Sequence, residues 1–205
     1  MKGSDYINLT GLIFLIGAGP MLAGGAQNAP AKTFIPKIAR IGKIQIGYAT
    51  QDDLAQRWGE GKTIIGGHAN SGRLWRVKGT AWVLRTDGFE YSKRGLVVDG
   101  LTLYADPKSF GSPGLLDAVP ATRRGKSNFA WGGEIGPGMA REKVLQILKH
   151  KSLPLTPTKD GCETTARGFY ALTSSLEPLR VWTTRFYFTN GVLSQLTLDA
   201  SFKGP

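Results

Sequence analysis

Residues 66–73 hold the densest group of side chains that could do chemistry. The string Gly-Gly-His-Ala-Asn-Ser-Gly-Arg brings His68, Asn70, Ser71 and Arg73 together in one glycine-rich stretch. Glycines let backbone amides approach an anion, and the imidazole, hydroxyl and guanidinium groups add hydrogen-bond donors. This pattern indicates an anion-binding site or the centre of a hydrolase. The same glycines also fit a loop that enters a strand at positive φ, which is the structural interpretation and the one we favour.

The rest of the sequence offers no catalytic set to accompany that loop. His68 and His150 are the two histidines, and no His/Cys cluster with zinc-ligand spacing exists. No Gly-x-Ser-x-Gly elbow is present. Cys162 is the single cysteine, so no internal disulfide can form, and no His or Asn near it in sequence would activate the thiol. We therefore predict no enzymatic activity, no metal and no cofactor.

A second group of residues combines arginine with aromatic side chains on predicted strands. In the stretch Val-Trp-Thr-Thr-Arg-Phe-Tyr-Phe at 181–188, strand alternation places Trp182 and Phe186 on one face and Arg185 and Tyr187 on the other. The apolar face should meet a helix, which leaves the arginine and the tyrosine on the open side.

Tyr, Trp and Arg are the residue types that dominate binding hot spots. By alternation, Leu101 and Leu103 should point inward, and Thr102 and Tyr104 outward. An ordinary solvated face with arginine stems over aromatic rings is the alternative. The residues that we predict to face outward and to bind a partner are Trp75, Arg76, Arg85, Arg185 and Tyr187.

Two similar series of elements must position these side chains. Thr50 and Asp53 fit a capping box, so a helix should begin there and end at Gly59. Apolar residues at helical spacing predict a second helix over residues 141–150. The predicted strands cover residues 73–77, 80–85, 89–91, 96–104, 164–172, 179–188 and 192–200.

The two series look like copies of one sequence. Residues 44–103 and 135–198 both end in a hairpin whose last strand contains Leu-Thr-Leu, at 101–103 and at 196–198. We therefore predict an α+β protein made of two tandem units, each a short helical element packed on an antiparallel β-sheet. The predicted divisions are an extended lead-in at 27–40, a first repeat at 41–105, a Pro/Gly/basic linker at 106–131 and a second repeat at 132–205.

The helix-opening motif of the second copy resembles a known family. The stretch Gly-Pro-Gly-Met-Ala-Arg-Glu-Lys-Val-Leu at 136–145 is similar to the signature of the outer-membrane assembly lipoproteins SmpA/OmlA, also called BamE. The family's later strand and hairpin positions are matched by Trp182, Phe188, Asn190, Gly191 and Val192. A weaker first copy is carried by Gly47, Tyr48, Thr50, Asp53 and Leu54. Two such units in tandem resemble the β-lactamase inhibitory protein (BLIP) fold, which implies a binding surface on the sheets.

The N-terminus reads as an export signal. Lys2 precedes an apolar run at 9–23, which small residues follow, so residues 1–26 are predicted to be a cleaved signal peptide and the protein secreted or periplasmic. An uncleaved N-terminal anchor is the alternative. No cysteine follows the run, so a lipoprotein anchor is not expected.

The chain is strongly basic, and this narrows the class of partner. Its formal net charge is +11. Residues 1–26 contain one basic and one acidic residue, Lys2 and Asp5, so their removal leaves the net charge unchanged. Such a charge favours acidic partners, while export disfavours nucleic acid. We predict an exported non-enzymatic binding protein that recognises a protein or an acidic envelope component through its sheet surface. The alternatives are a hydrolase or anion-binding enzyme centred on residues 66–73, and a structural envelope protein.

Overall fold

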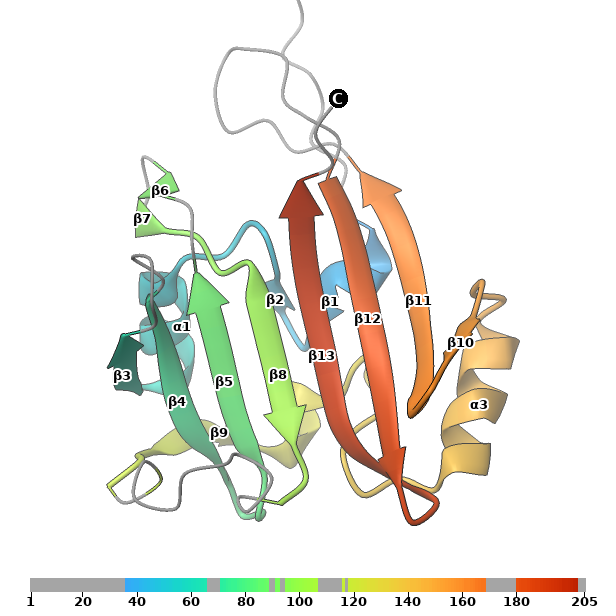
Figure 1. The fold of residues 1–205 in the computed structure, drawn as a ribbon. Coiled ribbons are helices and arrows are strands. Elements are labelled where there is room, and N and C mark those ends of the chain that lie inside the picture. The colour runs from blue at the N-terminus through green and yellow to red at the C-terminus, as the bar shows by residue number, and fades with distance from the viewer. Residues whose placement is uncertain are drawn as a thin grey trace, which may run out of the picture.

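One sheet of nine strands organises the molecule (Figure 1). The computed structural model describes residues 36–65, 71–88, 91–92, 95–106, 116, 118–168 and 180–202. The sheet runs in the order β10-β11-β12-β13-β8-β5-β4-β3, and β9 pairs in parallel with β4 beside that path. Its strands are β3 (Lys62–Ile65), β4 (Ser71–Lys78), β5 (Val83–Gly88), β8 (Gly100–Tyr104), β9 (Ala121–Gly125), β10 (Thr156–Thr158), β11 (Gly161–Gly168), β12 (Arg180–Thr189) and β13 (Val192–Phe202).

The prediction of two helix-on-sheet units is therefore wrong. Strands from both halves of the chain join one sheet, because β8 pairs antiparallel with β13. The two Leu-Thr-Leu triplets lie opposite one another across this seam, with Leu101 paired to Leu198 and Leu103 paired to Leu196. A sheet edge exposes unpaired N–H and C=O groups, and pairing β8 with β13 removes an edge from each half. Of the two predicted closing hairpins, only that of the second copy, β12–β13, is a hairpin of this sheet, whereas β8 of the first copy pairs with β5 and β13.

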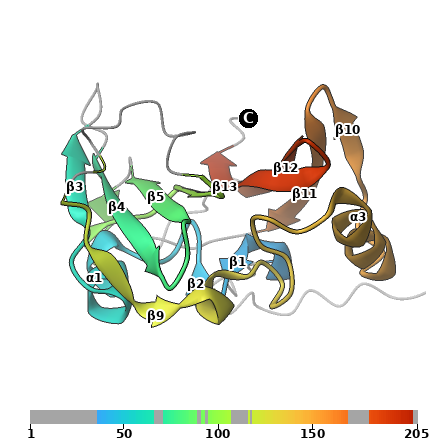
Figure 2. The same cartoon turned by 90° about the horizontal axis from the view of Figure 1, so that it is seen from below.

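A second layer covers one face of the sheet (Figure 2). It consists of η1 (Lys37–Ala39), β1 (Arg40–Ile41), β2 (Ile44–Gln45), α1 (Gln51–Trp58), η3 (Lys126–Phe129) and α3 (Arg141–His150). The main hydrophobic core lies between the layers and includes Leu54, Trp58, Leu101, Val144 and Leu198. A small hairpin of β6 (Tyr91–Ser92) and β7 (Gly95–Leu96) stands apart from the main sheet.

Three buried tryptophans donate hydrogen bonds to backbone carbonyls, and the two that belong to the sheet, Trp75 and Trp182, join it to the second layer. The indole N–H of Trp75 donates to the carbonyl of Gly59 at 2.8 Å, and that of Trp182 donates to Ile46 at 2.8 Å. Trp131 donates to the carbonyl of Ile38 at 3.0 Å. Each ring thus buries a large apolar area while its one polar group stays satisfied.

The helix predictions are confirmed. Thr50 Oγ1 accepts from the Asp53 amide at 3.2 Å, and Asp53 Oδ2 accepts from the Thr50 amide at 2.9 Å, which completes the predicted capping box of α1. Gly59, with φ of 91°, ends this helix. The helix predicted over 141–150 is α3, whose buried residues are Val144 and Leu148.

The lead-in and the linker hold more structure than their composition predicts. Ile38 and Ala39, at the end of the predicted lead-in, are buried against the sheet. The range 106–131 contains β9, which pairs with β4, and the buried rings of Phe129 and Trp131. Both segments contain apolar side chains among their polar residues, and burial of these apolar side chains accounts for the additional structure. The predicted signal peptide at 1–26 lies outside the described residues, among which no helix is long and apolar enough to cross a membrane.

The open face of the sheet as candidate interaction surface

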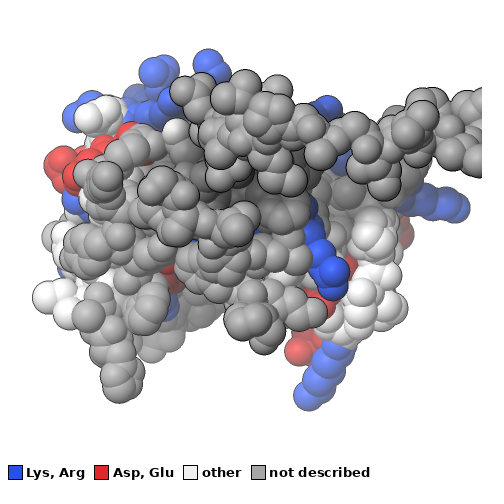
Figure 3. All heavy atoms as spheres, turned by 90° about the horizontal axis from the view of Figure 1, so that it is seen from above, with Lys and Arg blue, Asp and Glu red and all other residues white. Residues whose placement is uncertain are grey.

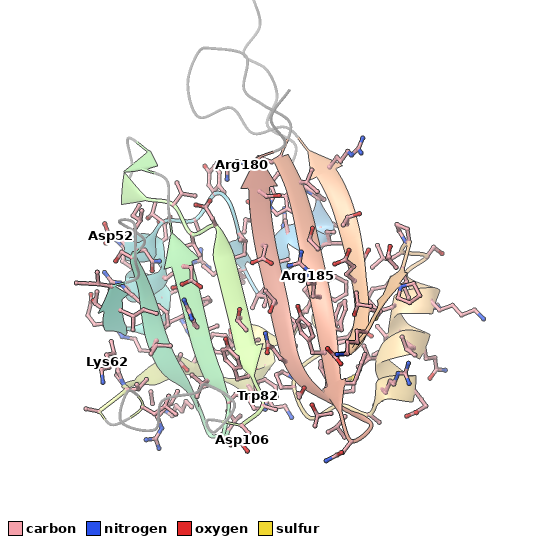
Figure 4. All side chains as sticks on the ribbon, viewed as in Figure 1. Asp52, Lys62, Trp82, Asp106, Arg180 and Arg185 are labelled. Atoms are coloured by element: carbon pink, nitrogen blue, oxygen red, sulfur yellow. The ribbon has the colours of Figure 1, made fainter. Side chains whose placement is uncertain are left out.

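The sheet face opposite the second layer, called the open face below, carries polar side chains in register across several strands. Backbone pairing places Arg85 of β5 opposite Thr102 of β8, Thr102 opposite Thr197 of β13, and Thr197 opposite Arg185 of β12. Glu163 of β11 extends this row beyond Arg185. Figure 4 labels Arg185 in the middle of β12 on the face turned to the viewer.

Arg185 is held by two carboxylates from the neighbouring strands. Its Nε donates to Glu163 Oε2 at 3.0 Å and its Nη1 donates to Asp199 Oδ2 at 2.6 Å. The arginine side chain is 36% exposed, so one part of the guanidinium group is committed to the sheet while another part reaches solvent. A partner would meet an arginine whose rotamer is already fixed.

A second arginine stands at the other end of the row. Arg85 donates to Asp87 Oδ1 through both Nε, at 3.0 Å, and Nη2, at 2.8 Å. Burial acts to lower the pKa of Arg85, but the hydrogen bond and the charge of Asp87, together with further contributions from Tyr104, outweigh it, so that the pKa is raised. Arg85 therefore stays a cation on a partly desolvated surface.

Two aspartates flank Gly100 between the arginines. A Cβ built on Gly100 would lie 3.5 Å from Asp199 Oδ1 and 3.6 Å from Asp87 Cβ. Burial raises the pKa of Asp199, Arg185 opposes this shift, and the charge of Asp87 adds to it. The centre of the open face thus combines cations, carboxylates and hydroxyls with no large surplus of either sign.

Aromatic and hydroxyl groups complete the open face. Tyr104 and Tyr187 lie in the row beside the arginine row, joined through Gln195. Burial raises the pKa of the Tyr104 phenol. The Thr102 and Thr197 hydroxyls lie 3.4 Å apart across the β8–β13 seam. Toward β4, Leu116 and Val119 pack with Leu74 and Val83 in a separate small cluster that also includes Ile64 and Tyr104.

The structure places most of the predicted partner-binding residues on the open face. Arg85, Arg185 and Tyr187 lie on it at intermediate exposure, and Arg76 lies on it exposed. Trp75 does not lie on the open face, so the prediction that it faces outward is wrong. Its ring is fully buried against Trp58, with 5.7 Å between the ring centroids.

The residues predicted to bind an anion are only partly described. His68 and Asn70 lie outside the described residues. Ser71 and Arg73 share a face of β4 with Trp75, the face turned to the second layer. Arg73 pairs with Glu60 and, at 3.8 Å, with Asp52. Because two carboxylates already balance its charge, Arg73 offers little attraction to an anion.

The sequence analysis missed the carboxylates of the open face. Asp87, Glu163 and Asp199 contact the two arginines, yet none was among the predicted site residues. Alternation gives the signal that could have found Asp199, which stands two residues after Thr197 and so shares its face. Glu163 needs the pairing of β11 with β12, which the local sequence does not specify.

Three further findings concern the wider charge distribution, metal ligands and similarity to known proteins. Seen from above, Lys and Arg side chains project at separate places around the margin (Figure 3). Among the described residues, no three His, Cys, Asp or Glu side chains gather as metal ligands would. No protein-family model matches the chain, and no curated protein or solved structure is significantly similar to it.

Proposed function

We propose that the protein is an exported, non-enzymatic binding protein that recognises a protein partner through the open face. The observation that carries this proposal is the row of side chains from Arg85 to Glu163, in which two arginines are fixed by carboxylates but remain partly exposed. Arginine and tyrosine that are already ordered lose little conformational freedom on binding, and these residue types form hot spots.

The balance of charge on this face favours a protein over an acidic polymer. Arg85 and Arg185 are accompanied by Asp87, Glu163 and Asp199, so a uniform polyanion would meet repulsion as well as attraction. A protein surface can present both signs in complementary positions. The acidic envelope component that the net charge favours therefore belongs elsewhere on the molecule.

Two features of the sequence support export and an envelope partner. Residues 1–26 have the pattern of a signal peptide. The resemblance of the motif at 136–145 to the SmpA/OmlA (BamE) signature supports an outer-membrane protein as the partner. The hydrolase alternative has less support, because Arg73 is already paired with two carboxylates.

Affinity capture with matched variants tests the proposal. The mature protein is immobilised and exposed to an envelope extract, alongside the double variant Arg185→Ala/Tyr187→Ala and the control Lys143→Ala/Lys149→Ala, whose lysines are exposed on α3. We expect the wild type and the control to retain a protein from the extract in a saturable manner. The first variant should not retain it. Equal retention by all three would contradict the proposal. The absence of saturable binding of any protein would favour a purely structural role.

A further inference from the structure

A basic hollow lies between the end of α1 and β9, away from the open face. It has a volume of about 670 Å³ and is lined by Gln56, Arg57, Arg123 and Arg124. Both elements belong to the side of the molecule that faces away from the open face (Figure 2). The hollow is therefore separate from the surface of the proposed function.

Contacts with α1 hold one of the three arginines in place. Arg123 Nη1 donates to the carbonyl of Gln56 in the last turn of the helix at 3.3 Å. Its aliphatic stem passes over Gly59, where an added Cβ would come within 3.4 Å of Arg123 Cγ. The carbonyl end of a helix carries partial negative charge, which favours a cation there. The partial charge explains why a cation such as Arg123 lies at the helix end. It does not explain the presence of Arg124, the next residue of β9.

The positive charge of this hollow is not compensated within the part of the chain that the structure describes. No carboxylate among those residues forms an ion pair with Arg57, Arg123 or Arg124. Arg73 and Arg185, by contrast, each contact two carboxylates. Three exposed arginines line the hollow without an ion-paired carboxylate among the described residues, and such an excess of positive charge attracts an anion.

We propose that this hollow binds the oxyanion groups of an acidic polymer. Guanidinium groups match phosphate and carboxylate oxygens with paired hydrogen bonds. The hollow is open to solvent and its arginines are exposed, so that a chain of repeated anionic groups can lie against them. The net charge of +11 steers such a polymer toward the protein.

Titration calorimetry with inorganic polyphosphate and with polyglutamate tests this site and distinguishes the two oxyanions. The test variant is Arg57→Gln/Arg123→Gln/Arg124→Gln. The control is Lys143→Gln/Lys149→Gln/Lys159→Gln, which removes the same charge from exposed positions in α3 and the turn that precedes β11. We expect the arginine variant to bind at least one of the polymers about tenfold more weakly than the control, with a smaller dependence on salt.

Equal losses in the arginine and lysine variants would overturn the proposal, since binding would then follow net charge alone. Binding of neither polymer by the wild type at low ionic strength would also overturn it. The single variant Arg124→Gln controls for misfolding of the triple variant, because Arg124 is exposed on β9 and its replacement should not disturb the fold. It should show part of the loss of polymer affinity. Arg185→Ala/Tyr187→Ala should bind the polymers normally, so failure of this site and failure of the proposed function are distinguishable.

Discussion

The pKa of Asp199, on the open face, is shifted in opposite directions by burial and by Arg185. Burial raises its pKa above the ordinary value of 3.8, and Arg185 only partly offsets the shift. The folded protein therefore holds this proton more tightly than the unfolded chain does. The contribution of Asp199 to the free energy of unfolding should thus fall as pH rises from 3.8 through the higher folded pKa. In Asp199→Asn this part of the pH profile should be flat, as measured by denaturant unfolding at a series of pH values. An unchanged profile would contradict the assignment.

Cys162 is a buried thiol on the face of β11 that meets the second layer. It is 6% exposed, and burial raises its pKa while the charge of Arg141 acts in the opposite direction. Because the thiolate is the reactive form, alkylation of the native protein should be slow and should accelerate when the protein unfolds. Thiol labelling with and without denaturant measures this. Native labelling at the rate of an exposed cysteine would show that the thiol is accessible.

At the scale of the element, the capping box of α1 is a local device whose contribution can be measured. Thr50→Ala removes the hydroxyl that accepts from the Asp53 amide, and it should lower the free energy of unfolding by about 1 kcal/mol. Thr50→Ser keeps the hydroxyl and serves as the control. Chemical denaturation of the three proteins checks this, and equal losses in both variants would assign the effect to packing of the threonine methyl.

Elements that depend on local signals could be predicted from the sequence, and pairings between distant strands could not. The start of α1 follows from Thr50 and Asp53, and the alternation in β12 correctly assigns Trp182 and Arg185 to opposite faces. Alternation also contradicts an outward-facing Trp75, which is adjacent to Arg76 in one strand, so that the two side chains cannot both face outward. The union of β8 with β13 has no local signal, because its partners lie far apart in the chain.

At the scale of the whole molecule, one continuous sheet predicts one cooperative unit. Leu198 is fully buried at the seam and pairs with Leu101, so Leu198→Ala should cost about 2–5 kcal/mol. Both halves should lose stability together, since strands from both meet there. Tryptophan fluorescence and Cys162 labelling should report the same shifted midpoint. Separate transitions for the two probes would show that the halves unfold independently.

Two surfaces of the molecule differ in their balance of charge. On the open face, Arg85 and Arg185 are balanced by carboxylates, which suits a protein partner of mixed charge. At the hollow, Arg57 and Arg124 have no such balance among the described residues, which suits an acidic polymer.

Site-specific photocrosslinking tests the central claim, recognition through the open face, most directly. A photoreactive aromatic residue replaces Tyr187 on the open face, or Gln146 on the exposed side of α3 as the control. In an envelope extract, the probe at position 187 should form a crosslink to a protein that excess unlabelled wild type suppresses and that excess Arg185→Ala does not. The probe at position 146 should form none. Crosslinking from position 146 but not from 187, or equal suppression by the wild type and Arg185→Ala, would contradict the claim.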